Sequence, residues 1–228
     1  WPPAAGMKHL RDLMPEHMQL QPRDIYNAVM QLPELPTRDD LRRMLPPEEQ
    51  KQLDRIFETH AEIGRYDVRG ATLYGIGECM RSELFSSVLK EENFETVAAF
   101  MRASHNGDRL FQFEDTGKSR RFSVATDDAT LAEMAHRNIP LSTQCGRYAC
   151  STEAIDQLVD IAQAVPGVVG AQLAGAGLGG CMMILARVSA LDTLKDRLET
   201  SFYVPRSLAP DIHVCNPVAG AGLVSVAS

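Results

Sequence analysis

The chain has 228 residues, a formal net charge of −7, 44% hydrophobic residues and 23% charged residues. This composition predicts a globular protein with a sizeable core, in one large or two small domains, and the negative charge argues against nucleic-acid binding. The five cysteines are scattered, without a C-x-x-C pair, which favours reduced core thiols over disulfides or a metal site. We expect a cytoplasmic location and, because no initiator Met precedes Trp1, a processed or partial sequence.

Prolines are frequent in residues 1–50, and short helices are predicted between them, over 23–31 and 37–45. Thr37 is a plausible N-cap, and Pro46-Pro47 ends one helix and begins the next. We interpret 1–50 as a proline-rich helical lead-in that carries no visible chemistry. Residues 51–228 are expected to form the main domain.

Helical periodicity dominates from Pro47 to His105. One apolar stripe is predicted to run along a helix to Ile63, a second helix to cover 73–90, and a third to begin after the N-cap Asn93. His105 falls near the C-terminus of the third helix, where the dipole favours a positive imidazole. A surface histidine is the favoured interpretation, with a catalytic one as the alternative.

The stretch 111–148 is the least regular. Its basic cluster 118–121 predicts a solvated loop, with a phosphate contact as the alternative, and a short helix is expected over 127–137. Beyond it, a helix led by Ser151 is predicted to end at Pro166-Gly167. A Ser189-capped helix over 191–198, a strand over 211–215 and an apolar tail from Pro217 are expected to follow.

A glycine-rich stretch lies between two apolar runs, Val168–Leu173 and Cys181–Val188, each of strand length. It reads Gly175-Ala176-Gly177-Leu178-Gly179-Gly180. Glycines permit positive φ, so consecutive amides there can form a nest that favours an anion. A tight turn without any ligand remains the alternative.

Two other interpretations of this stretch are weaker. Gly175, Gly177 and Gly180 spell G-x-G-x-x-G, but that dinucleotide fingerprint needs a helix after the last glycine, and an apolar strand-like run follows here. A membrane helix is disfavoured by the central glycines. The pattern of helix, strand, glycine turn, strand, helix and strand predicts an α+β fold, with a mainly antiparallel sheet covered by helices.

Specific residues resemble a known family at this point. The runs 151–162 and 165–181 are similar to the C-terminal part of galactokinases, in the superfamily of galactokinase, homoserine kinase, mevalonate kinase and phosphomevalonate kinase. The glycine stretch corresponds to the third motif of that superfamily. Upstream, 77–81 and 100–105 resemble the preceding helices of galactokinases, so the resemblance covers roughly residues 50–215.

This resemblance implies an ATP-dependent kinase that phosphorylates the anomeric hydroxyl of a sugar, with Mg²⁺ and ATP as cofactors. It also implies a ferredoxin-like C-terminal domain whose glycine loop faces an inter-domain cleft. Because phosphoryl transfer depends mostly on positioning and charge stabilisation, main-chain N–H groups suit the task. The cofactor-binding residues carried over are Gly175, Ala176, Gly177, Gly179 and Gly180.

The departures from the family are equally informative. Ala174 stands where galactokinases often carry a hydroxyl residue, and 111–148 is longer than the usual connection. The sequence contains no Pro-x-x-x-Gly-Leu-Ser-Ser-Ser motif and no segment that supplies the catalytic Asp and Arg. We therefore assign no catalytic residue and no metal ligand.

The leading hypothesis is a C-terminal half of a galactokinase-like sugar kinase, inactive without its N-terminal ATP-binding domain. A non-catalytic module for small-ligand binding or subunit contact is the alternative, and a dinucleotide-dependent oxidoreductase is a third. A half-enzyme also predicts an apolar face exposed where the other domain docks, which a homo-oligomer would cover.

Overall fold

The computed structural model describes residues 9–13 and 19–216. Its α+β class agrees with the sequence prediction. Each of the two sheets is an antiparallel pair, β1 with β2 and β3 with β4, so the expected larger sheet is divided into two small ones. The helices and strands are α2 (Pro22–Val29), α3 (Arg38–Met44), α4 (Pro47–Glu58), α5 (Val68–Lys90), α6 (Phe94–Asp108), β1 (Phe111–Phe113), β2 (Ser119–Arg121), α7 (Asp128–His136), α8 (Glu153–Gln163), β3 (Val168–Ala174), β4 (Cys181–Ala186) and α9 (Leu191–Leu198).

Capping residues set the helix starts. Thr37 and Asn93 cap α3 and α6 as predicted, because each side chain accepts from an amide in the first turn of its helix. Asp67 caps α5, which begins five residues before the predicted start because the Asp67 carboxylate accepts from the Gly70 amide at 2.8 Å. Thr152 rather than Ser151 caps α8.

Several predicted elements are wrong. The stripe helix α4 ends at Glu58, so Ile63 lies outside it and is 66% exposed. The basic cluster 118–121 mostly belongs to β2, although its side chains are exposed as expected. Residues 211–215 pair with no strand in the described chain, and Ala190 rather than Ser189 is the N-cap of α9. The expected tail from Pro217 lies outside the described residues.

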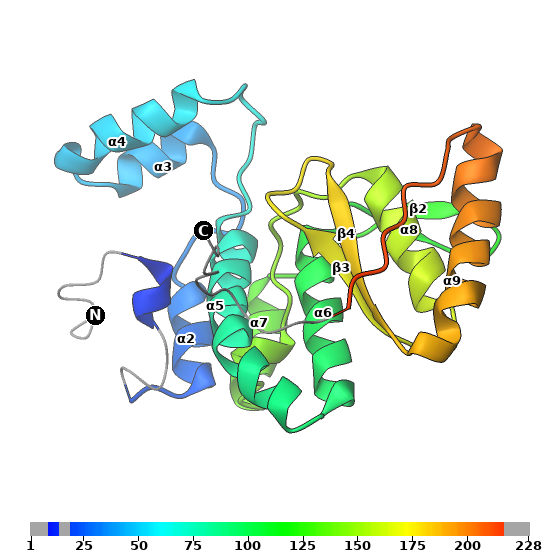
Figure 1. Cartoon of the computed structure of the whole chain (residues 1–228). Coiled ribbons are helices and arrows are strands. Elements are labelled where there is room, and N and C mark those ends of the chain that lie inside the picture. Colours follow the sequence, from blue (N-terminus) through cyan, green and yellow to red (C-terminus); the bar gives the residue numbers. More distant parts are fainter. Residues whose placement is uncertain (1–8, 14–18, 217–228) are drawn as a thin grey trace, which may run out of the picture.

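The core is divided into a helical and an α+β cluster. The helical cluster joins α2, α5 and α7 with the short 3₁₀ turn η3 (Leu141–Thr143), and the α+β cluster joins α8, β3, β4 and α9. Figure 1 shows these two halves side by side with α6 between them, while α3 and α4 stand apart above the helical half. Because α6 contacts both α5 and β3, it carries buried residues along most of its length.

The hairpin of β3 and β4 is held from two sides. Ala171 and Leu173 pack into the α+β cluster, whereas Gly170 lies so close to α6 that an added Cβ would come within 2.7 Å of the Met101 sulfur. The register pairs Gln172 with Met183 and Ala174 with Cys181. This packing places the loop between the strands at the same end of the molecule as the start of α5 (Figure 1).

All five cysteines are free, as expected, but Cys181 and Cys215 are exposed rather than buried in the core. No helix within the described residues is long and apolar enough to cross a bilayer.

Candidate functional site

The glycine loop between β3 and β4 has a left-handed backbone along most of its length. Gly175, Gly177, Gly179 and Gly180 have φ of 91°, 85°, 119° and 91°, and Leu178 has φ of 61°. The positive φ that the sequence predicts these glycines to permit is thus adopted at all four of them. Since the strand β4 follows directly, the loop does not open a helix, and the dinucleotide fingerprint is excluded.

Most amides of this loop point to no acceptor in the described chain. The Leu178 amide donates to the Cys150 carbonyl at 2.6 Å, and no backbone bond in the described residues uses the amides of Gly175, Gly177, Gly179 or Gly180. Unpaired N–H groups at successive positive-φ residues are the features of an anion-binding nest. The predicted nest is therefore geometrically possible here.

The glycines of the loop differ in what surrounds them. An added Cβ at Gly177 would lie 2.5 Å from the Cys150 sulfur and 2.6 Å from its carbonyl oxygen, so only glycine fits. At Gly175, Gly179 and Gly180 an added Cβ would meet nothing within 4 Å. Gly177 thus anchors the loop, and the other three leave its backbone open to a ligand.

The loop rests on a segment formed by residues 146–151, which is fixed by backbone hydrogen bonds. The Arg147 amide donates to the Gly70 carbonyl at 2.8 Å, and the Tyr148 and Ala149 amides donate to the Gly107 carbonyl at 2.7 and 3.0 Å. Ala149, a residue with a side chain, has φ of 58°. Strained backbone of this kind persists only where neighbouring structure holds it, and it is common at functional sites.

A carboxyl lies directly beneath this segment. Asp108, at the end of α6, is 5% exposed, and the Cys150 thiol donates to its Oδ1 at 3.2 Å. Burial raises the pKa of Asp108, against the opposing effect of hydrogen bonds from Cys150 and Tyr74. Burial, assisted by the neighbouring Asp108, also raises the pKa of Cys150 to about 12, so this thiol is not a nucleophile.

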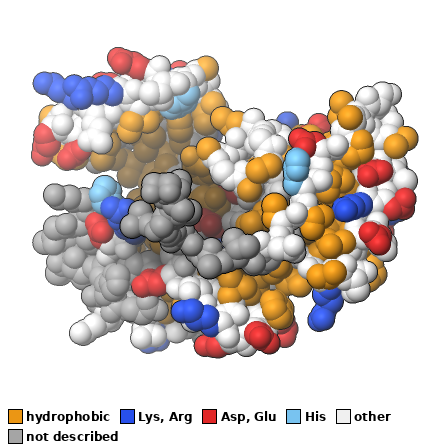
Figure 2. Space-filling model, in the orientation of Figure 1, with side chains coloured by type: hydrophobic (Ala, Val, Ile, Leu, Met, Phe, Trp, Pro, Cys, Tyr) orange, Lys and Arg blue, Asp and Glu red, His pale blue; other side chains and the backbone are white. Residues whose placement is uncertain are grey.

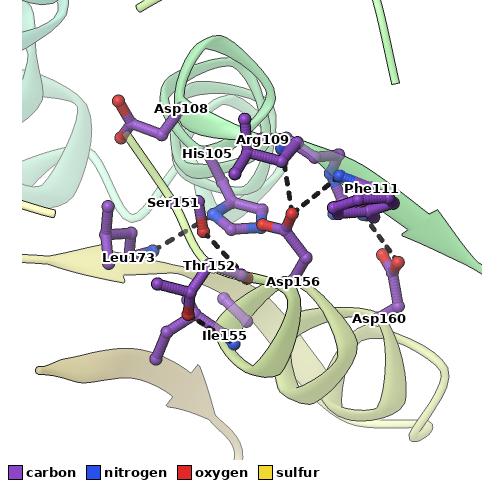
Figure 3. A network of polar contacts seen from close by, with 12 residues as sticks. His105, Asp108, Arg109, Phe111, Ser151, Thr152, Ile155, Asp156, Asp160 and Leu173 are labelled. Atoms are coloured by element: carbon purple, nitrogen blue, oxygen red, sulfur yellow. Dashed lines mark hydrogen bonds and ion pairs between the residues drawn. The ribbon is translucent and has the colours of Figure 1, made fainter. Parts of the chain in front are cut away.

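His105 is not the surface histidine that its position in the sequence favours. It is completely buried, since α6 continues to Asp108 and its last turns are covered by β3 and α8 (Figure 3). Its Nδ1 accepts from the Leu173 amide at 3.3 Å, which leaves the proton on Nε2, 3.4 Å from Oδ1 of Asp156. Burial, together with the charge of Arg109, lowers the pKa of His105 to about 3, so this contact joins a neutral imidazole to a carboxylate.

Two carboxylates of α8 complete this buried cluster. The second oxygen of Asp156 accepts from the Leu110 and Phe111 amides at 2.9 and 2.8 Å. Asp160 accepts from the Phe113 amide at 2.8 Å and from the Arg109 guanidinium at 2.6 Å (Figure 3). These bonds join α6, β1 and α8. The bond from the Leu173 amide to His105 then attaches β3 to α6.

Sequence reasoning missed the residues that surround the loop, namely Tyr74, Asp108, Tyr148 and Cys150. They come from α5, from the end of α6 and from the irregular stretch, and the fold alone brings them together. Gly146 is the one signal that the sequence offered. It has φ of 57°, and an added Cβ there would lie 2.2 Å from the Tyr74 amide nitrogen, so a glycine is required at this crossing.

A separate groove of about 640 Å³ lies between α5, α6 and the hairpin, on the face of Gln172 and Met183. Its other lining residues include Glu78, Phe85 and Phe100. In the described residues no three His, Cys, Asp or Glu side chains are grouped to hold a metal ion.

Comparison with known proteins bears on this loop. Residues 122–204 match the family described as GHMP kinases C terminal, and this range contains the whole hairpin. The chain is similar to the C-terminal part of galactokinases. The resemblance stated from the sequence is thereby confirmed.

Three galactokinases illustrate the similarity. That of Roseiflexus sp. is 35% identical over 77 residues, which are 34% of this chain and 20% of that protein. That of Exiguobacterium sibiricum is 27% identical over 118 residues, 52% of this chain and 28% of that protein. The Homo sapiens galactokinase is 49% identical over 43 residues, 19% of this chain and 11% of that protein. The chain therefore spans well under a third of the galactokinases that it matches.

Proposed function

We propose that this chain is the C-terminal portion of an ATP-dependent, galactokinase-like sugar-1-kinase and supplies the glycine loop to an inter-domain active site. The free amides of the loop carry this proposal. A transferred phosphoryl group carries negative charge on several oxygens, and preorganised N–H groups stabilise such charge without any acidic or basic side chain. The similarity of residues 122–204 to the GHMP kinase C-terminal family supports the same assignment.

ATP fits the loop through its phosphates. The amides of Gly175, Ala176, Gly177, Gly179 and Gly180 are the groups that would face phosphate oxygens, and three of these glycines leave the approach open. Mg²⁺ requires carboxylate or phosphate oxygens, and the described residues offer no acidic cluster beside the loop. We therefore assign the Mg²⁺ ligands, the main grip on ATP and the catalytic base to an N-terminal ATP-binding domain.

The coding sequence upstream of Trp1 tests this proposal first. We expect an in-frame segment of the Gly-Leu-Ser-Ser-Ser type, which would supply the second phosphate-binding loop. A stop codon with no such segment upstream would contradict the sugar-kinase proposal.

Activity of the 228-residue chain is the second test. We expect no transfer of phosphate from ATP to galactose above the background without enzyme, because one glycine loop cannot by itself position ATP, metal and sugar. Robust turnover by this chain would overturn the assignment of the catalytic groups to another domain. A Gly179→Ala variant of the whole protein should lose most of its turnover, whereas a substitution at the distant, exposed Glu133 should not.

A non-catalytic subunit-contact module is the second candidate. Hydrophobic side chains gather over β4 and the nearby C-terminal segment in Figure 2, around a groove of about 330 Å³. Val188 is 82% exposed there, and Met182 and Ile212 line the groove. Exposed apolar patches of this kind are typical of interaction surfaces, and a homo-oligomer would cover this one. Light scattering that gives a monomeric mass at high protein concentration would contradict a homo-oligomer.

A further inference from the structure

An exposed aromatic ring lies next to the glycine loop, and the proposed function does not use it. Tyr148 is 58% exposed, and its ring stacks on that of Tyr74 with centroids 5.1 Å apart and planes 11° from parallel. One face of the Tyr148 ring is thus covered by Tyr74, which leaves the other face to solvent. The solvent-exposed face of the ring is therefore open to a ligand.

The position of this ring is fixed by its surroundings. The Tyr148 amide bonds the Gly107 carbonyl at 2.7 Å, and the preceding Arg147 amide bonds Gly70 at 2.8 Å. Tyr74 beneath it is part of α5, and it is packed so closely on Gly107 that an added Cβ there would lie 2.4 Å from the Tyr74 ring. The ring is therefore preorganised, which lowers the entropy lost when a ligand stacks on it.

The backbone of Tyr148 is also close to the residue that holds the loop. Cys150 touches the loop directly through the 2.6 Å bond from the Leu178 amide, and Tyr148 precedes Cys150 by two residues. Two residues span at most about 7 Å, so the Tyr148 backbone lies within roughly one sugar ring of the residue that contacts the nest.

We propose that Tyr148, supported by Tyr74, is a stacking platform for the acceptor sugar. This inference rests on the proposed function and names the part of the site that takes the sugar. One face of a hexose ring presents mainly C–H groups, which pack against an aromatic face, while its hydroxyls stay available for polar contacts. Arg147 precedes Tyr148 in the sequence, and its guanidinium could bond the sugar hydroxyls. Its Nη1 lies 3.9 Å from Asp67 Oδ2.

The irregular stretch thereby gains a role. Tyr148 stands at the end of the irregular stretch 111–148, which the resemblance to galactokinases predicts to be longer than their usual connection. The platform would make sugar selection a property of this stretch, while the nest on the neighbouring hairpin addresses the phosphate.

Saturation-transfer NMR on the full chain without ATP tests this proposal, with D-galactose, D-glucose and D-mannose as probes. We expect at least one of these hexoses to bind, Tyr148→Ala to weaken its binding roughly two- to tenfold, and Tyr148→Phe to retain it. Phe94→Ala is the matched control, because Phe94 is a 45% exposed aromatic at the opposite end of α6. Thermal unfolding of each variant verifies that it is folded.

Two results would overturn the proposal. In the first, no hexose binds, or Tyr148→Ala binds it as tightly as the parent chain. In the second, ADP binds instead of any hexose and loses affinity in Tyr148→Ala, which would assign the ring to the base. Because ATP and upstream sequence play no part in this measurement, its failure is distinguishable from failure of the kinase assignment.

Discussion

The buried cluster under β3 and the surface around the glycine loop both contain groups with shifted pKa values, but the surface around the loop also presents unpaired amides and an exposed aromatic ring. Under β3, His105, Asp156 and Asp160 are enclosed and their contacts join one element to another. Around the loop, amides are unpaired within the described chain and Tyr148 is exposed. A shifted pKa alone therefore does not locate a functional site, since structural clusters shift pKa values too.

We infer from this difference that β3 has a structural role and that the loop of the hairpin is the part that contacts a ligand. β3 is fixed to α6 at Gly170 and, next to the loop, at Leu173, so it supports the loop as a rigid base. The loop itself is attached to the protein at Gly177 and Leu178, through Cys150. The following experiments change the loop, the buried cluster, and then the junction between them.

The largest effect is expected at the anchor of the loop. Gly177→Val forces a β-branched residue to φ of 85° and against the Cys150 sulfur, so it should lower the free energy of unfolding by roughly 4 kcal/mol, from backbone strain plus overpacking. Gly175→Val is the control, because its φ of 91° gives the same strain in open space. Urea unfolding measures both, and equal losses would refute the anchoring role of Gly177.

The buried cluster should respond next. Asp156→Ala removes the acceptor for the Leu110 and Phe111 amides, and the carboxylate oxygen that lies 3.4 Å from His105 Nε2. The two buried amides are then left unpaired, which should cost roughly 3 kcal/mol. Asp156→Asn keeps an acceptor oxygen and should cost less than half as much. If the free energy of unfolding of the alanine variant lies within about 1 kcal/mol of the parent value, the cluster does not hold α6 to α8.

The protonation of His105 should make stability depend on pH. Its folded pKa of about 3 lies below the value near 6.5 of an exposed histidine, so below pH 6.5 the unfolded chain binds a proton that the folded chain does not. Stability is then complete above about pH 6.5, and it falls as the pH drops towards 3, by roughly 1.4 kcal/mol per pH unit from this group.

His105→Gln should remove this contribution, whereas His136→Gln, at the exposed end of α7, should not. Asp108, whose pKa is raised, acts in the opposite direction, because it favours the folded state at low pH and loses that effect as the pH rises through its folded pKa. It is common to all three proteins, so it cancels in the difference. Parallel pH profiles for the parent and His105→Gln would show that the buried imidazole is not neutral.

The smallest effect concerns the junction between the two regions, where α8 begins just after Cys150. Thr152 caps this helix by accepting from the Ile155 amide at 3.3 Å, so Thr152→Ala should cost about 1 kcal/mol. Ser151→Ala should cost less, because Thr152 and not Ser151 is the N-cap of α8. A larger loss of thermal stability in Ser151→Ala than in Thr152→Ala would contradict this cap.

Local signals in the sequence were sufficient for much of this protein. The glycines between two apolar runs predicted a strand, a left-handed turn and a strand, because few other residues accept positive φ. Helix caps and stops are equally local signals, because they depend only on residues within one turn. Thr37, Asn93 and Pro166-Gly167 are examples. The α+β class and the galactokinase resemblance followed from such local patterns.

Only the tertiary structure decided which residues are buried and which meet. His105 looked like a surface residue because it falls near the C-terminus of a predicted helix, yet β3 and α8 enclose it. Tyr148 stacks on Tyr74, 74 positions earlier, and no local pattern encodes that contact. Periodicity and propensity report on one turn or one strand, whereas burial and pKa depend on partners that the fold brings from elsewhere in the chain.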